Sequence, residues 1–71
     1  MILITKLDNR KMVINAELIE MIETTPETLI TLTTGKKVVV KETVEEVVEK
    51  IKTFKKELIL PIIKVNENQN L

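Results

Sequence analysis

The sequence contains neither cysteine nor histidine, and in a chain of only 71 residues this absence limits what can hold a fold together. A domain of this size buries about 60% of the surface that its unfolded chain exposes, so its stability margin is small. Such domains commonly supplement their core with disulfides, a bound metal or association between copies. Without cysteine or histidine, disulfides, thiolate zinc sites and histidine-ligated metals are all excluded. The sequence therefore predicts a homo-oligomer without a cofactor.

The charge balance of the chain argues against nucleic acid and anionic membranes as partners. Eleven basic and eleven acidic side chains cancel, so no net field attracts nucleic acid or an anionic membrane. No stretch approaches the roughly 20 apolar residues that span a bilayer, and residues 1–6 lack the pattern of a secretory signal. We therefore expect a cytoplasmic protein. Phe54 is the single aromatic residue, so one copy cannot assemble a base-stacking platform.

Short apolar and β-branched segments, separated by turn residues, predict antiparallel strands. Asp8 and Asn9 suit a tight turn, Pro26 suits the second position of a type I turn, and Gly35 can take a positive φ. The predicted strands are residues 2–7, 11–14, 19–24, 28–33 and 37–41. The expected fold class is α+β and mostly β: about five short strands in a small curved sheet or barrel-like domain, then one C-terminal amphipathic helix and an apolar tail.

The segment 15–23 fits two patterns. Ile14, Leu18 and Ile22 match one face of a helix, whereas the alternation that begins at Leu18 also matches a strand. The hairpin expected around Pro26 favours a single turn capped by Asn15, followed by a strand.

The C-terminal helix has the clearest start. Thr43 and Glu46 form a capping box, in which each side chain accepts a hydrogen bond from a free backbone N–H group. Pro61 cannot continue a helix, so we predict a helix over 44–58 and then a tail over 58–71 that is first extended and apolar, then polar. Residues 1–57 form the single domain. The apolar stripe of the helix comprises Val44, Val47, Val48, Ile51, Phe54 and Leu58.

The inventory of side chains predicts that the protein is not an enzyme. Without histidine or cysteine, acid, base and nucleophile roles fall to carboxylates, lysines and hydroxyls on a domain too small to enclose a cleft. The sequence therefore predicts no catalytic, cofactor-binding or metal-binding residues.

A lysine cluster at the end of the helix adjoins the apolar tail. One interpretation is a helix C-terminus with favourable cations and a tail folded onto the core or onto another copy. The other is a partner-binding site, in which the apolar residues fill a groove on another protein or a membrane surface and the lysines form the rim. The candidate residues are Lys50, Lys52, Lys55, Lys56, Ile59, Leu60, Ile62 and Ile63.

Several motifs together resemble the FlbD family of small bacterial flagellar proteins, also called swarming motility proteins of the SwrD type. They are Asn-x-x-Leu-Ile-Glu over 15–20, Ile-Glu-x-Thr-Pro-x-Thr over 22–28 and Thr-x-Gly-Lys over 33–36. The likeness covers residues 1–57, and Asp8-Asn9-Arg10 stands where the family turn is Asn-Gly. The resemblance implies a non-enzymatic accessory protein that supports motor output during swimming and swarming. It also implies a cytoplasmic place near the motor, at the inner face of the membrane, and a motor component as the partner.

A second likeness concerns layout alone. The short strands and the final valine strand that leads into a helix are similar in outline to the carbon storage regulator family of dimeric RNA-binding proteins. That family uses basic residues on edge strands, and Lys6, Lys37 and Lys41 occupy broadly comparable places. A small dimeric RNA-binding regulator is therefore the alternative function.

Overall fold

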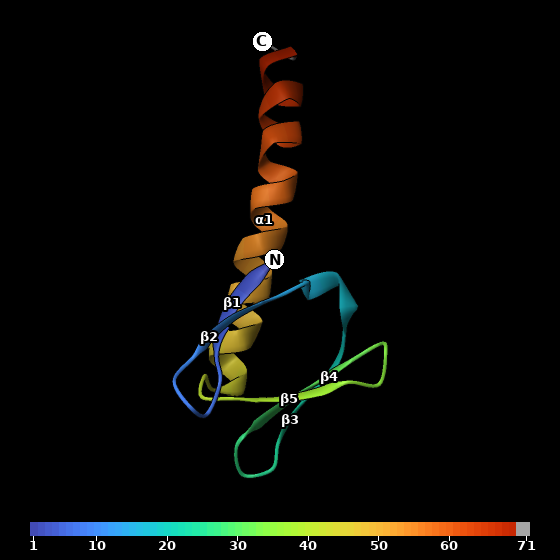
Figure 1. Ribbon diagram of the computed structural model, residues 1–71. Helices are drawn as coiled ribbons and strands as arrows, with labels where there is room; N and C mark the ends of the chain where they lie inside the picture. Colours follow the sequence, from blue (N-terminus) through green and yellow to red (C-terminus); the bar gives the residue numbers. More distant parts are fainter. Residues whose placement is uncertain (70–71) are drawn as a thin grey trace.

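The computed structural model describes the backbone of residues 1–69 and the side chains of residues 1–58. Five short strands are followed by one long helix (Figure 1). The elements are β1 (Ile2–Thr5), β2 (Lys11–Ile14), the 3-10 turn η1 (Ala16–Leu18), β3 (Ile19–Thr24), β4 (Thr28–Leu32), β5 (Lys37–Val40) and α1 (Val44–Gln69).

The strands form two antiparallel sheets, β1-β2 and β3-β4-β5. They meet where Lys6 bridges Val40 and the Lys41 N–H donates to the Thr5 carbonyl at 2.9 Å. The described strands do not close into a barrel. The predicted fold class, mostly β with one C-terminal helix, is confirmed.

Two of the three turns between strands have the backbone conformation that their residue types predict. Asn9 takes a φ of 71° and Gly35 a φ of 89°, as residues that tolerate left-handed backbone do. The third turn joins β3 and β4 around Pro26, and its Thr25–Pro26 peptide bond is cis. The expected hairpin around Pro26 is present, with Thr24 opposite Thr28.

The ambiguous segment is a single turn followed by a strand. The Asn15 side chain accepts a hydrogen bond from the Glu17 N–H at 3.0 Å, which caps η1, and β3 begins directly afterwards at Ile19. The alternative of a helix over these residues is therefore wrong. A side-chain cap of this kind satisfies a backbone donor that a short turn leaves free.

The core lies between the inward faces of the two sheets and the first half of α1. Alternation decides which residues enter it: Ile2 and Ile4 are buried on β1, whereas Leu3 between them is exposed. Met12, Ile19, Ile22, Leu32, Ile51 and Phe54 are partly buried against it. The fully buried side chains are Ile4, Ile30, Val40 and Val47.

Helix α1 starts at the predicted Val44 but ends at Gln69, well beyond the predicted end at Leu58. The extended apolar segment expected over 58–63 is therefore wrong. A proline inside a helix removes one backbone donor and costs about 3 kcal/mol relative to alanine. Pro61 is the single helix breaker among 26 residues, so the hydrogen bonds on both sides continue the helix across it.

The first half of α1 lies beside the strands, and its second half extends away from them (Figure 1). The molecule measures 50 × 23 × 18 Å, with a radius of gyration of 15.1 Å. A compact domain of this length has a radius of gyration of about 11 Å. The excess reflects the projecting helix.

Candidate functional site

The start of α1 is fixed to strand β1 by one carboxylate. Glu42 Oε1 accepts the Thr5 N–H at 2.9 Å, and Oε2 accepts the Thr5 hydroxyl at 2.8 Å. The same hydroxyl accepts a hydrogen bond from Lys11 Nζ at 3.0 Å. Partial burial alone would raise the pKa of Glu42, but the hydrogen bonds from Thr5, aided by nearby Lys50, outweigh it and lower this pKa. Glu42 therefore acts as a charged clamp between helix and sheet.

The capping box predicted at the helix start is confirmed. The Thr43 N–H donates to Glu46 Oε1 at 2.8 Å, and the Glu46 N–H donates to Thr43 Oγ1 at 3.1 Å. The Val47 N–H closes the first turn on the Thr43 carbonyl at 3.0 Å. Together with the clamp, this box sets the direction in which α1 leaves the domain.

The apolar stripe of α1 begins in the core and ends in solvent. Val47 is fully buried, and Ile51 and Phe54 are partly buried against the sheets. Leu58, one turn after Phe54, is 55% exposed. The stripe therefore continues past the point where the strands can cover it.

The outward positions of the β1-β2 hairpin are also apolar. Leu3 and Val13 are opposite each other across the two strands and are 49% and 60% exposed, and Met1 is 62% exposed. Such directly paired side chains lie in contact range. Single exposed apolar residues are ordinary on a protein surface, but clustered ones mark contact sites.

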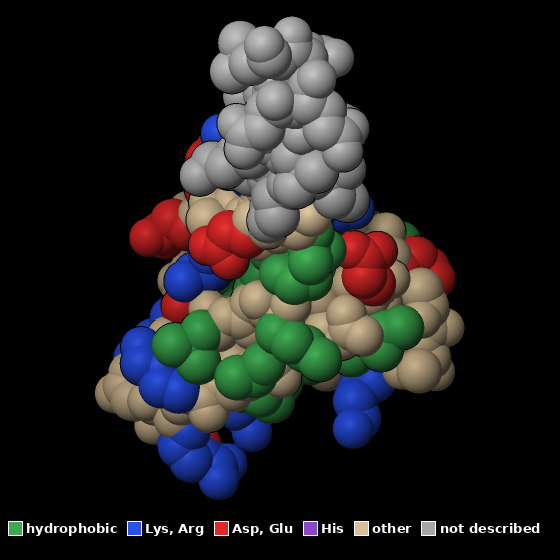
Figure 2. Space-filling view, turned by 90° about the horizontal axis from the view of Figure 1, so that it is seen from above, with side chains coloured by type: hydrophobic (Ala, Val, Ile, Leu, Met, Phe, Trp, Pro, Cys, Tyr) green, Lys and Arg blue, Asp and Glu red, His purple; other side chains and the backbone are tan. Residues whose placement is uncertain are grey.

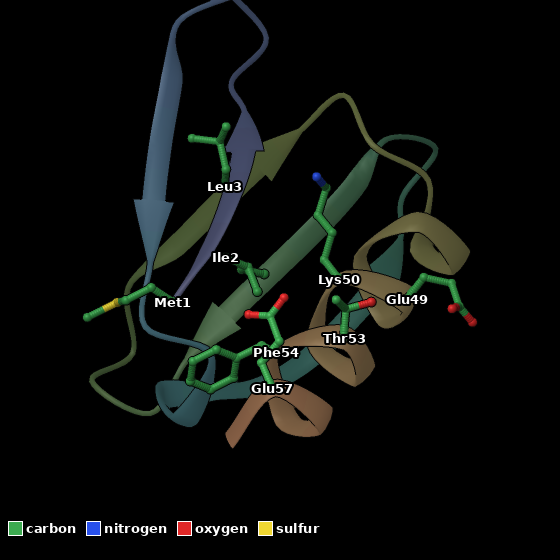
Figure 3. A pocket seen from close by; sticks show the side chains of 8 residues that line it. All are labelled: Met1, Ile2, Leu3, Glu49, Lys50, Thr53, Phe54 and Glu57. Atoms are coloured by element: carbon green, nitrogen blue, oxygen red, sulfur yellow. The ribbon is translucent and has the colours of Figure 1, made fainter. Parts of the chain in front are cut away.

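A groove of about 320 Å³ brings this hairpin face and the helix together. Met1, Ile2 and Leu3 form one wall, and the helix residues around Phe54 form the other (Figure 3). The helix wall comprises Glu49, Lys50, Thr53, Phe54 and Glu57. Figure 3 shows Ile2 directed toward the helix, with the Phe54 ring beside the start of β1. We refer to Met1, Leu3, Val13, Phe54 and Leu58 as the apolar face.

Figure 2 shows several hydrophobic side chains exposed on one face of the molecule, with acidic side chains on either side of them and basic side chains toward the border. Sequence reasoning had not placed Met1, Leu3 or Val13 in a site. Their signal was present in the alternation, because each is an apolar residue at a position that faces away from the core.

The lysines predicted at the end of the helix lie well before it, because α1 continues to Gln69 and has no basic residue in its last turn. Their interpretation as favourable cations at a helix C-terminus is therefore wrong. Lys50 is half-buried and lines the groove, whereas Lys52, Lys55 and Lys56 are exposed. Lys52 Nζ lies 3.7 Å from Glu49 Oε1, a surface ion pair of small energetic weight. The side chains of the predicted tail residues Ile59, Leu60, Ile62 and Ile63 lie outside the described residues.

The lysines assigned to the RNA alternative lie elsewhere. Lys6 and Lys37 line a second hollow near the β1-β2 turn, and Lys41 Nζ donates to Asn9 Oδ1 beside it. Among the described residues, no group of three acidic, histidine or cysteine side chains is arranged to hold a metal ion.

Within the part of the chain that the structure describes, no helix is both long and apolar enough to cross a membrane.

Comparison with protein families adds one finding to this geometry. The family model FlbD, described as flagellar and swarming motility proteins, matches residues 1–59. No curated protein and no solved structure matches the chain. The matched region contains both sheets, the clamp at Glu42 and every described residue of the apolar face.

Proposed function

Because the chain belongs to the FlbD family of flagellar and swarming motility proteins, we propose that it supports bacterial swimming and swarming by binding a component of the flagellar motor. Its role is that of an accessory protein that catalyses no reaction. It acts in the cytoplasm, at the inner face of the membrane near the motor. The sequence agrees with a non-enzymatic role, since it supplies neither histidine nor cysteine for acid, base or nucleophilic chemistry.

The apolar face is the observation that carries the proposal of a protein partner. Leu3, Val13 and Leu58 are each about half exposed or more. Leu3 lines the groove, Val13 is paired with Leu3 across the hairpin, and Leu58 lies one helical turn after Phe54 of the groove wall. A stable protein interface buries about 800 Å² on each partner. That is roughly 15% of the 5239 Å² surface of this chain, so the hairpin face and the projecting helix must both contribute.

The exposed lysines of α1 suit the rim of such an interface. Lys52, Lys55 and Lys56 are exposed and lie within the stretch 49–57 of α1 that lines the groove. Charges at a rim raise the rate of association with an oppositely charged partner more than they raise the final affinity. We include the tail residues Ile59, Leu60, Ile62 and Ile63 in the proposed interface, as the continuation of the helix beyond Leu58.

The proposal is tested by deleting the gene, scoring swimming and swarming, and counting flagella. We expect reduced motility with an unchanged number of flagella, and rescue by the unmodified gene. Normal motility in the deletion strain would contradict the proposed function.

Rescue with single variants locates the interface. Leu3→Asp and Leu58→Asp should fail to restore motility, because each places a charge in the apolar face. Met21→Asp is the matched control, since Met21 is 46% exposed on β3 and takes no part in the groove. Circular dichroism and immunoblotting must show that all three variants are folded and present. Equal rescue by all three would reject the apolar face as the interface.

Two further variants distinguish a role of the tail in partner binding from the alternative function in RNA binding. Ile62→Asp should impair rescue if the tail contributes to partner binding. Lys37→Glu combined with Lys41→Glu leaves the apolar face unchanged. If only the double lysine variant failed to rescue, the tail would lose its proposed role, and RNA binding would gain support if the purified variant had also lost affinity for an RNA oligonucleotide.

A further inference from the structure

A second hollow, of about 490 Å³, lies at the opposite end of the β1-β2 hairpin from Met1. It is formed where the turn after β1 bends away from the first residues of β5. It shares no residue with the groove beside the helix. Its walls are Lys6, Leu7, Asp8, Met12, Lys36, Lys37, Val38 and Val39.

The edge of β5 that faces this hollow has free backbone groups. The Leu32 N–H donates to the Lys36 carbonyl at 2.8 Å, and the register continues with Ile30 opposite Val38. Hydrogen-bonded and non-bonded pairs alternate along an antiparallel pair. The even-numbered residues of β5 therefore bond to β4, and the odd-numbered ones direct their N–H and C=O groups to the other edge.

Only the last part of that edge is occupied. The Lys41 N–H donates to the Thr5 carbonyl at 2.9 Å, but the chain then turns, with the Asn9 N–H bonded to the Lys6 carbonyl at 2.9 Å. Strand β1 therefore stops before it can reach the earlier part of β5. Among the described residues, the edge N–H and C=O groups of Lys37 and the edge N–H group of Val39 have no strand partner, and the antiparallel bridge between Lys6 and Val40 lies directly beyond them.

Positive charge surrounds this open edge. Lys6, Lys36 and Lys37 line the hollow, and none of them takes part in an ion pair among the described residues. Asp8 is the single acidic residue in the walls, and its carboxylate is already hydrogen-bonded. Its carboxylate accepts the Arg10 backbone N–H at 3.1 Å and Arg10 Nε at 2.7 Å, and these contacts lower the pKa of Asp8. The hollow therefore favours an anionic ligand.

The floor of the hollow is apolar and contains no aromatic ring. Val38 is buried, Met12 and Val39 are half-buried, and Leu7 is 50% exposed. Nucleic-acid bases bind such surfaces by stacking on aromatic or arginine side chains, and neither lines this hollow. A ligand with an aliphatic side chain between two carboxylates would suit this hollow, because the aliphatic group matches the apolar floor and the carboxylates match the lysines around it.

We propose that this hollow binds an extended, acidic segment of a partner protein, which adds as a short strand to the free edge of β5. The N–H and C=O groups of Lys37 and the N–H group of Val39 would pair with the segment, one aliphatic side chain would enter the hollow, and flanking carboxylates would meet the three lysines. The surface is separate from the apolar face, so the two proposals can fail independently.

The test uses the full chain and a fluorescein-labelled heptapeptide of alternating glutamate and valine, followed by fluorescence anisotropy. Lys36→Glu combined with Lys37→Glu should weaken binding by about tenfold or more, because two attractions become repulsions. Lys55→Glu combined with Lys56→Glu makes the same change of charge on the helix and should alter affinity by less than about twofold. Equal effects of the two pairs would overturn the proposal.

Changes to the backbone of the peptide and of the protein test whether the peptide binds as an added strand. Two peptides, N-methylated on alternate amides along one edge or along the other, should differ, because only one edge of the added strand bonds to β5. Val39→Pro should weaken binding without unfolding, since the lost N–H points away from β4. Equal binding of the two methylated peptides would overturn strand addition.

Three other results would also overturn the proposal. One is the absence of saturable peptide binding by the folded chain. Another is preferential binding of a single-stranded RNA oligonucleotide that the Lys36 and Lys37 variant abolishes. The last is a change of that variant from oligomer to monomer in light scattering, which would identify a second copy of the chain as the occupant.

Discussion

Replacing Glu42 with alanine should loosen the attachment of helix α1 to strand β1. The Glu42 carboxylate accepts two hydrogen bonds from Thr5, at 2.9 and 2.8 Å, across a sequence separation of 37 residues. Hydrogen bonds to a charged group contribute about 1.5–3 kcal/mol each, and partial exposure reduces each of these two to about 1 kcal/mol. We therefore expect a loss of about 2 kcal/mol in the free energy of unfolding.

For a domain of this size each kcal/mol lowers the melting temperature by about 4–8 °C, so Glu42→Ala should melt roughly 8–16 °C lower. Urea unfolding followed by circular dichroism measures the same loss. Thr5→Val is the matched partner variant, since it removes the hydroxyl contacts to Glu42 and Lys11 and keeps the backbone N–H contact to Glu42. In a double-mutant cycle the two changes should be non-additive, because they remove a shared interaction.

The pH dependence gives an independent check through Glu42→Gln. The pKa of Glu42 is lowered below its usual 4.5 in the folded state, so its stabilising effect is present above pH 4.5 and is lost as the pH falls through the folded-state pKa. The stability difference between the unmodified chain and Glu42→Gln should therefore be largest near neutral pH and vanish in acid. A difference that stays constant with pH, or no difference at pH 7, would refute the clamp.

Three further predictions concern the core, a turn and self-association. Ile30→Ala, at a side chain with 0% exposure, should cost about 2–5 kcal/mol in urea unfolding. Gly35→Ala should cost about 1–2 kcal/mol through its φ of 89° alone, because an added Cβ meets no atom within 4 Å, and Gly35→Asn should recover part of this loss. We propose that the chain self-associates, and size-exclusion chromatography with light scattering should detect a dimer or larger species; a clean monomer at high concentration would contradict this.

Local chemistry in the sequence was enough to predict much of the fold. The Asn15 cap, the turn at Asn9 and the capping box at Thr43 each depend on groups within a few residues, and the structure has all three. Alternation on β1 and β2 likewise identifies which side chains enter the core, as Ile4 and Ile14 show. Contacts between residues that are close in sequence can be predicted from those residues alone.

The end of the helix was mispredicted, at a proline. The rule that proline ends a helix competes at Pro61 with the hydrogen bonds of a 26-residue helix, and the helix continues. The sequence states a local preference there that a wider context overrides.

The candidate sites could not be predicted in full, because they join distant parts of the chain. The groove brings the start of β1, at Ile2, together with Phe54 of α1, and the clamp joins Thr5 to Glu42. The open edge of β5 depends on where β1 stops, and so on the placement of the whole hairpin. Lys50 was named from sequence alone, but its place in the groove follows from the packing of α1 on β1.

Photo-crosslinking in living cells tests the apolar face most directly. A photoreactive phenylalanine derivative is incorporated in place of Leu3 or, as the matched control, in place of Met21, which has a similar exposed fraction on β3. The account predicts that position 3 forms a covalent adduct with a flagellar motor protein, identified by mass spectrometry, and that position 21 does not. No adduct from position 3, or the same adducts from both positions, would contradict it.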